Sequence, residues 1–168
     1  NSASLADTFY VRKDTVPAVV TNNIASGDQA WRNAAGTAYD LDFTDAGGSL
    51  LDKFQVKITT GASQTGTLVT DWADNNTGIS APAYSADWPL AAGLWDLLRE
   101  GTNYVSLRAY DIAGNITFST DAFRVFKDTT TPSVTDNQAG DDAWRSANTG
   151  LYNVDFADTG GSLIDRIQ

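Results

Sequence analysis

The sequence predicts an all-β protein, built as an antiparallel β-sandwich that is repeated in tandem. Three observations lead to this prediction. Short stretches alternate apolar and polar residues, as strands with one buried face do. Clusters of Gly, Asn, Asp, Ser and Thr separate these stretches, and Asp outnumbers Glu by 20 to 1, which favours turns over helices. The third observation is a long internal repeat.

The repeat pairs residues 27–55 with residues 140–168 without a gap, at an offset of 113. The two stretches are identical at 16 of 29 positions, which include Trp31/Trp144, Arg32/Arg145, Tyr39/Tyr152, Phe43/Phe156 and the letters GGSL at 47–50 and 160–163. A second match pairs FYVRKDT at 9–15 with FRVFKDT at 123–129, each followed by a proline, Pro17 or Pro132. A period of this size is the length of one domain, longer than helical or propeller repeats.

The two matches divide the chain into three parts. We expect residues 1–15 to be the last strand of a preceding unit, residues 16–130 to be one complete unit, and residues 131–168 to be the first strands of the following unit. Neighbouring repeats of the same chain are therefore the expected partners of the complete unit.

Within that unit the alternation predicts about seven strands, a number typical of a sandwich. The first is a proline-flanked edge strand at 16–21. Further strands are predicted at 39–43, 54–59, 67–72, 84–90, 103–111 and 116–125. The side chains expected to face the core are Tyr39, Leu41, Phe43, Phe54, Val56, Ile58, Val105, Leu107 and Ala109. Those expected to face solvent include Gln55, Lys57, Tyr104, Ser106, Arg108 and Tyr110.

One stretch has helical spacing, AAGLWDLLREG at 91–101. It predicts one or two turns with Leu94, Leu97 and Leu98 on one side and Gly101 as the stop. A tight turn is predicted after the strand at 103–111. There Gly114 and Asn115 tolerate positive φ, and Asp111 can accept hydrogen bonds from the turn amides.

The stretch GTNYVSLRAYDIAGN at 101–115 resembles bacterial immunoglobulin-like repeats of large secreted and surface proteins. In such repeats the penultimate strand ends in A-x-D-x-AGN, matched here by Ala109, Asp111, Ala113, Gly114 and Asn115. Their junction motif, KDT followed by a proline, is matched at 13–15 and at 127–129. The resemblance implies an immunoglobulin-like sandwich in each unit and says nothing of a ligand.

The sequence departs from this family at Asn103, where many such domains carry a tyrosine whose hydroxyl closes a corner. The corner must then be held by the Asn103 amide or be left open. This affects the expected local geometry and not the expected fold.

Composition excludes several functions. The net charge of −10 repels phosphate backbones, so we expect no nucleic-acid partner. The chain has no Cys, His or Met, which removes thiol and imidazole chemistry and suits an extracellular or cell-surface location. No apolar run approaches 18 residues and no signal peptide is evident, so we expect no membrane span in this segment.

Carboxylates are the strong metal ligands that remain. Calcium needs six to eight oxygens that converge on one point, and the candidates are Asp14, Asp28, Asp111, Asp128, Asp141 and Asp142. No EF-hand loop or cadherin-type acidic motif is present. We therefore expect these residues to form turns and to carry solvated charge, with no cofactor, and calcium at an inter-repeat junction is the minor alternative.

Tryptophans raise a second binding hypothesis. Trp31, Trp72, Trp88 and Trp95 could form a sugar-stacking platform if they shared an exposed face, but packing at structural sites is the favoured reading. The Trp-Arg pairs at 31–32 and 144–145 are expected to brace a loop, with inter-repeat contact as the alternative. No carboxylate pair stands out and histidine is absent, so we expect no catalytic residues and no enzyme.

These observations favour a structural function. Tandem domains joined by short connections form a rod whose length scales with repeat number. We expect a repeat module of a long extracellular stalk, adhesin or filament that supplies length and stiffness, with lateral copies as further partners in a filament. Two alternatives are a glycan- or protein-binding adhesin module that uses exposed loops or tryptophans, and a subunit that polymerises by strand exchange.

Overall fold

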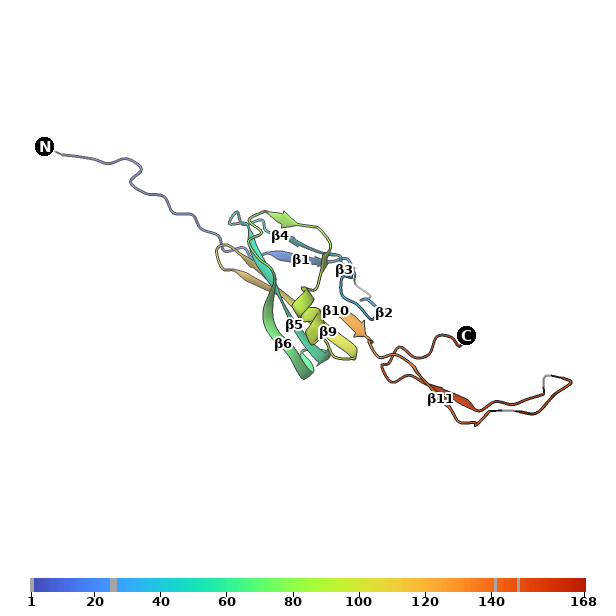
Figure 1. The fold of residues 1–168 in the computed structure, drawn as a ribbon. Helices are drawn as coiled ribbons and strands as arrows, with labels where there is room; N and C mark the ends of the chain where they lie inside the picture. The colour runs from blue at the N-terminus through green and yellow to red at the C-terminus, as the bar shows by residue number, and fades with distance from the viewer. Residues whose placement is uncertain (1, 25–26, 141, 148) are drawn as a thin grey trace.

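The protein is mostly β, and its antiparallel sheets form a sandwich-like body (Figure 1). The computed structural model describes residues 2–24, 27–140, 142–147 and 149–168. An extended segment leaves the body at the N-terminal end, and a long hairpin lies beyond the opposite end (Figure 1). The predicted all-β class is therefore confirmed.

The larger layer is a five-stranded sheet in the order β2-β10-β9-β5-β6. Its strands are β2 (Trp31–Arg32), β5 (Leu51–Gly61), β6 (Thr65–Asn76), β9 (Gly101–Asp111) and β10 (Ile116–Lys127). The pairings are antiparallel except for the short parallel contact of β2 with β10.

The opposing layer consists of β1 (Val19–Asn22), β4 (Leu41–Thr44) and β7 (Ala83–Tyr84) in the order β1-β4-β7. Beside it a small pair joins β3 (Ala38–Tyr39) to β8 (Trp88–Pro89). The single segment predicted at 84–90 is therefore two short strands. Residues 85–87 separate the two strands, because β7 pairs with β4 and β8 pairs with β3.

The core lies between the layers and holds every residue that the alternation assigned to it. The side chains of Phe54, Val56, Ile58, Val105 and Leu107 have no solvent exposure. Across the gap the Phe43 ring stacks on Phe54 at 4.4 Å between centroids, and the Tyr39 ring stacks on Phe123 at 4.1 Å. Aromatic contacts of this kind add to the free energy gained from burial alone.

The predicted outer face of the large sheet is less solvated than alternation suggests. Ser106 and Gln55 are buried, although both point away from the core-facing row. A register shift in β10 between Ser119 and Phe123 places the Asp121 N–H at 3.1 Å from Ser106 Oγ, to which it donates. Gln55 accepts hydrogen bonds from Arg108 and Tyr110 and donates to Asp74.

The helical stretch forms α1 (Ala92–Leu97), as predicted, but two of its details were wrong. Leu94, Trp95 and Leu98 are the buried residues, whereas Leu97 is 51% exposed, because the helix presents positions i, i+1 and i+4 to the core. Gly101 does not stop the helix, since Leu98 is its C-cap and Gly101 begins β9.

Asn103 holds the corner between α1 and β9. Its side chain is fully buried, its Oδ1 accepts the Arg99 N–H at 3.0 Å, and its Nδ2 donates to the Arg99 carbonyl at 2.8 Å. The amide thus satisfies both the N–H and the carbonyl of Arg99. Of the two outcomes expected for this position, the structure shows the first.

Outside the body, residues 2–15 form no strand, while β11 (Ser133–Asp136) pairs antiparallel with β12 (Val154–Ala157). This hairpin repeats the pairing of β1 with β4, at an offset of 114 residues for the first strand and 113 for the second. Among the described residues, no helix has the length and apolar character needed to cross a membrane.

Replacing Phe123 by alanine should lower the free energy of unfolding by about 3–5 kcal/mol, because the ring is buried and leaves a cavity. Phe118→Ala on the same strand is the control, since that ring is 59% exposed and surface changes cost roughly 0.5 kcal/mol. Denaturant unfolding of both variants measures the difference. Equal losses would contradict the assignment of the core.

Candidate functional site

The candidate site is the place where the N-terminal segment meets the body, and its central residue is Asp14. The Asp14 carboxylate accepts the Ser49 N–H at Oδ2 and the Val16 N–H at Oδ1, both at 2.9 Å. Ser49 lies in the GGSL loop between β4 and β5, far from Asp14 in the sequence. One carboxylate therefore joins the incoming chain to the body.

The same arrangement occurs at the other end of the body. Asp128 follows β10 directly, and its carboxylate accepts the Ser162 N–H at 2.9 Å and the Thr130 N–H at 3.0 Å. Asp14 and Asp128 occupy the same position in the KDT motif, and Ser49 and Ser162 the same position in GGSL. We call each of these arrangements an aspartate clamp.

Glycine makes each clamp sterically feasible. A Cβ atom on Gly47 would lie 1.9 Å from Asp14 Oδ1, and a Cβ atom on Gly160 would lie 1.7 Å from Asp128 Oδ1. A side chain at either position would displace the carboxylate, because real Cβ contacts are never so short. The first glycine of GGSL is thus required for docking.

A second aspartate shapes each GGSL loop from inside. Asp45 accepts the N–H groups of Gly47 and Leu50 at 3.1 and 2.8 Å, and Asp158 accepts that of Gly160 at 3.2 Å. These bonds hold the loop amides in place for the clamp. The loop thus has hydrogen bonds of its own besides those to the KDT aspartate.

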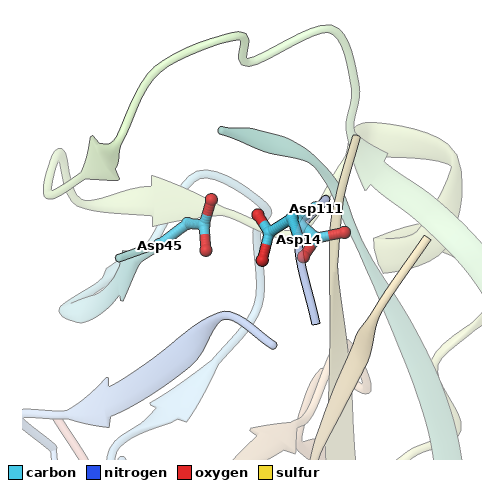
Figure 2. A group of neighbouring side chains, drawn as sticks. All are labelled: Asp14, Asp45 and Asp111. Carbon is cyan, nitrogen blue, oxygen red and sulfur yellow. The ribbon is translucent and has the colours of Figure 1, made fainter. Parts of the chain in front are cut away.

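At the first clamp three carboxylates converge, as Figure 2 shows. Oxygens of Asp14, Asp45 and Asp111 lie within 4.8 Å of one another, and Asp45 and Asp111 are buried. Asp111 accepts the Asn115 N–H at 2.8 Å and its side-chain amide at 2.7 Å, as predicted for this turn. The same amide also donates to the Asp14 carbonyl at 3.3 Å.

This cluster has the oxygen chemistry that a hard cation such as Ca²⁺ uses. Ca²⁺ takes six to eight oxygens, and the six oxygens of these three carboxylates each already accept one N–H. Within the described ranges, no Lys or Arg forms an ion pair with any of the three. The bonds present show three carboxylates that each accept hydrogen bonds from a turn or loop.

The other calcium candidates lie elsewhere. Asp28 forms an ion pair with Arg32 at 3.2 Å near the opposite end of the body, where Asp128 also lies. Asp142 belongs to the exposed tip beyond β11, and Asp141 lies outside the described residues. The structure therefore brings Asp14 and Asp111 together and adds Asp45, which the sequence reasoning had not considered as a ligand.

The tryptophans do not form a common platform. Trp88 and Trp95 are buried in the core beside α1, as the structural interpretation predicted. Trp72 lies on the outer face of the large sheet, where the Arg108 guanidinium sits 4.6 Å from its ring centroid. Trp31 lies at the C-terminal end of the body and is 38% exposed.

Trp31 and the Arg32 backbone both contact the end of the body, and the Arg32 guanidinium pairs with Asp28. Trp31 packs on Phe126 at 5.2 Å between ring centroids, and the Arg32 carbonyl accepts the Asp128 N–H at 2.9 Å. The second copy differs, because Trp144 is fully exposed. Glu100 completes this end by accepting hydrogen bonds from the Thr129 N–H and hydroxyl at 2.9 and 2.5 Å.

Comparisons of this chain with protein-family models, with curated proteins and with solved structures found no match. The interpretation of the site therefore depends on its own residues and on the internal repeat.

The sequence contained a signal for the parts of the clamp that were missed. Asp45 and Gly47 are among the identical positions of the repeat, where they align with Asp158 and Gly160. Their spacing, D-x-GGSL, is that of a carboxylate capping the N–H groups of the loop that follows it. What the sequence does not show is that the KDT aspartate meets this loop.

Acid should undo the second clamp. The Ser162 side chain and N–H, with the Thr130 N–H, lower the pKa of Asp128 below its usual 3.8, although burial opposes them. A carboxyl group whose pKa is lowered on docking stabilises the docked state above pH 3.8 and loses that contribution as the pH falls through the lower value. The amide proton shift of Ser162, followed by NMR, should therefore titrate below pH 3.8. A midpoint above pH 5 would contradict the clamp.

Gly47→Ala should release the N-terminal segment, because the new Cβ displaces the Asp14 carboxylate. The docked segment then loses its hydrogen bonds to a charged group, so tryptic cleavage after Lys13 should accelerate several-fold. Gly93→Ala is the control, since its Cβ meets nothing within 4 Å. Equal cleavage rates in the two variants would show that Asp14 does not hold the segment.

Proposed function

We propose that this chain is a structural repeat module of a long extracellular bacterial surface protein, a stalk or a filament. Its body is an immunoglobulin-like unit that supplies length, and its aspartate clamps supply stiffness. The observation that carries this proposal is the recurrence of the clamp at both ends of the body with the same motifs and distances.

The exposure of the two arms supports the assignment of residues 16–130 as a unit. Phe9 and Val11 are 82% and 80% exposed, whereas their counterparts in the repeat, Phe123 and Val125, are buried. In the second copy Tyr152 is 59% exposed, although Tyr39 is buried. The arms thus carry side chains suited to cores that neighbouring units would complete.

The chemistry of the clamp supports stiffness. The connection between the last strand of one unit and the first strand of the next is a few residues long and contains a proline. Within it the KDT aspartate is bonded to a loop of the following unit, so the connection has a second attachment point besides the covalent one. Rotation about the linker would break the Asp–Ser hydrogen bond.

A spin-label experiment tests this function. The chain has no cysteine, so Ala62→Cys and Thr135→Cys, both at exposed positions, place one label on the body and one on the hairpin. We expect a single narrow distance distribution that Asp128→Ala broadens, because the clamp is lost. Asp165→Ala removes the same charge at an exposed position and should leave the distribution narrow. A broad distance distribution in the doubly labelled chain without further substitutions would contradict the spacer function.

A further inference from the structure

We propose that the tryptophan of the Trp-Arg pair is the second contact between consecutive units, and that the hollow beside Gly48 is the seat for the tryptophan of the preceding unit. This inference depends on the proposed function, since it names the surface and the partner by which units dock. It assigns a role to Trp31, Gly48 and Arg12 that bracing of a single unit does not explain.

The first observation is the position of Trp31. One side of its ring packs on Phe126 of the same body. The Cη2 atom of the same ring faces Gly161 of the segment that follows, where a Cβ atom would lie 2.8 Å from it. Gly161 is the second glycine of GGSL and follows the glycine of the clamp. The tryptophan therefore contacts the same loop that Asp128 binds.

The second observation is the hollow at the opposite end of the body. Gly48 occupies the position of Gly161 in its own GGSL loop, yet a Cβ on Gly48 would meet nothing within 4 Å. A hollow of about 670 Å³ lies beside it, lined among others by Arg12, Lys13, Leu50 and Ile112. That volume exceeds the space one indole needs, and Ile112 at its edge is 55% exposed.

The third observation identifies what would lie beneath the incoming ring. In the body, β10 pairs with β2 so that Phe126 lies opposite Trp31. Arg12 occupies the position of Phe126 in the first copy of the motif, FYVRKDT against FRVFKDT, and it lines the hollow. The preceding tryptophan would thus lie over the Arg12 guanidinium, and a cation–π contact would replace the ring pair seen at Trp31.

The two glycines provide a matched experiment in the chain as it stands. Both have positive φ, +97° at Gly48 and +112° at Gly161, so alanine strains the backbone alike at both positions. With 5-fluorotryptophan incorporated, the five tryptophans give five ¹⁹F resonances, and Trp31→Phe identifies that of Trp31. Gly161→Ala should shift the Trp31 resonance, because the ring must move away from the new Cβ. Gly48→Ala should leave it unchanged.

An extended chain tests the hollow itself. Residues 16–122 are placed before Phe9 in a second copy, in place of residues 1–8, so that Phe9 continues the strand as Phe123 does. The buried hydrophobic residues of the described structure all lie between Ala18 and Val125. The added residues 16–122 contain all of them except Phe123 and Val125, whose positions Phe9 and Val11 take. The four added tryptophans include a second Trp31, whose resonance Trp31→Phe in the added copy identifies. Gly48→Ala in the original copy and Arg12→Ala should each shift that resonance.

The outcomes separate this inference from the spacer function. If Gly161→Ala leaves the ¹⁹F chemical shift of Trp31 unchanged, the tryptophan contact is overturned, whether or not the extended chain folds. If the spin-label distribution stays narrow in that case, the spacer function stands on the aspartate clamp alone. If the spin-label distances are broadly distributed while Gly161→Ala still shifts the Trp31 resonance, the spacer function is overturned instead. If both Gly161→Ala and Gly48→Ala shift the Trp31 resonance in the unextended chain, the shift reports backbone strain and the contact is overturned.

Discussion

The hydrogen bond from a backbone N–H of the GGSL loop to the KDT aspartate is the interaction on which the architecture depends. It joins residues that are 35 positions apart at Asp14 and 34 positions apart at Asp128. A charged acceptor makes such a bond stronger than one between neutral groups. The absence of a side chain on Gly47 and Gly160 gives the carboxylate room to approach.

The core fixes where this aspartate lies. Strand β10 runs from the buried residues Phe123 and Val125 directly to Lys127 and Asp128. Lys127 is itself buried, and its Nζ donates to the Leu98 carbonyl at 3.1 Å, just after α1. The cation thus satisfies a carbonyl at the C-terminal end of the helix. The clamp begins one residue later, so its position is set by core packing and not by a flexible linker.

Most of the sandwich could be predicted because alternation reports burial directly. The burial of Tyr39, Leu41 and Phe43 was predicted correctly, since each strand has one face toward the core. The errors occur where tertiary context overrides the pattern. Ser106 is buried by an irregularity in a neighbouring strand, and Leu97 is exposed because a short helix shows only a narrow face to the core. Neither effect can be predicted from the local sequence.

The junction was only half predictable. The repeat identified the KDT and GGSL motifs, and Asp111 was correctly expected to bind the turn that follows it. The contact of one motif with the other crosses the boundary of the proposed unit, and the alternation within a single strand does not report such a contact. Asp45 and Trp31 lie at opposite ends of the body, where each contacts a GGSL loop.

The central claim is that units joined by this junction keep a fixed orientation. Small-angle X-ray scattering of chains with two, three and four copies of residues 16–129 measures it most directly. A rigid junction predicts that the maximum dimension increases by the same increment with each added unit. Growth as the square root of unit number, as flexibly linked units show, would contradict the account.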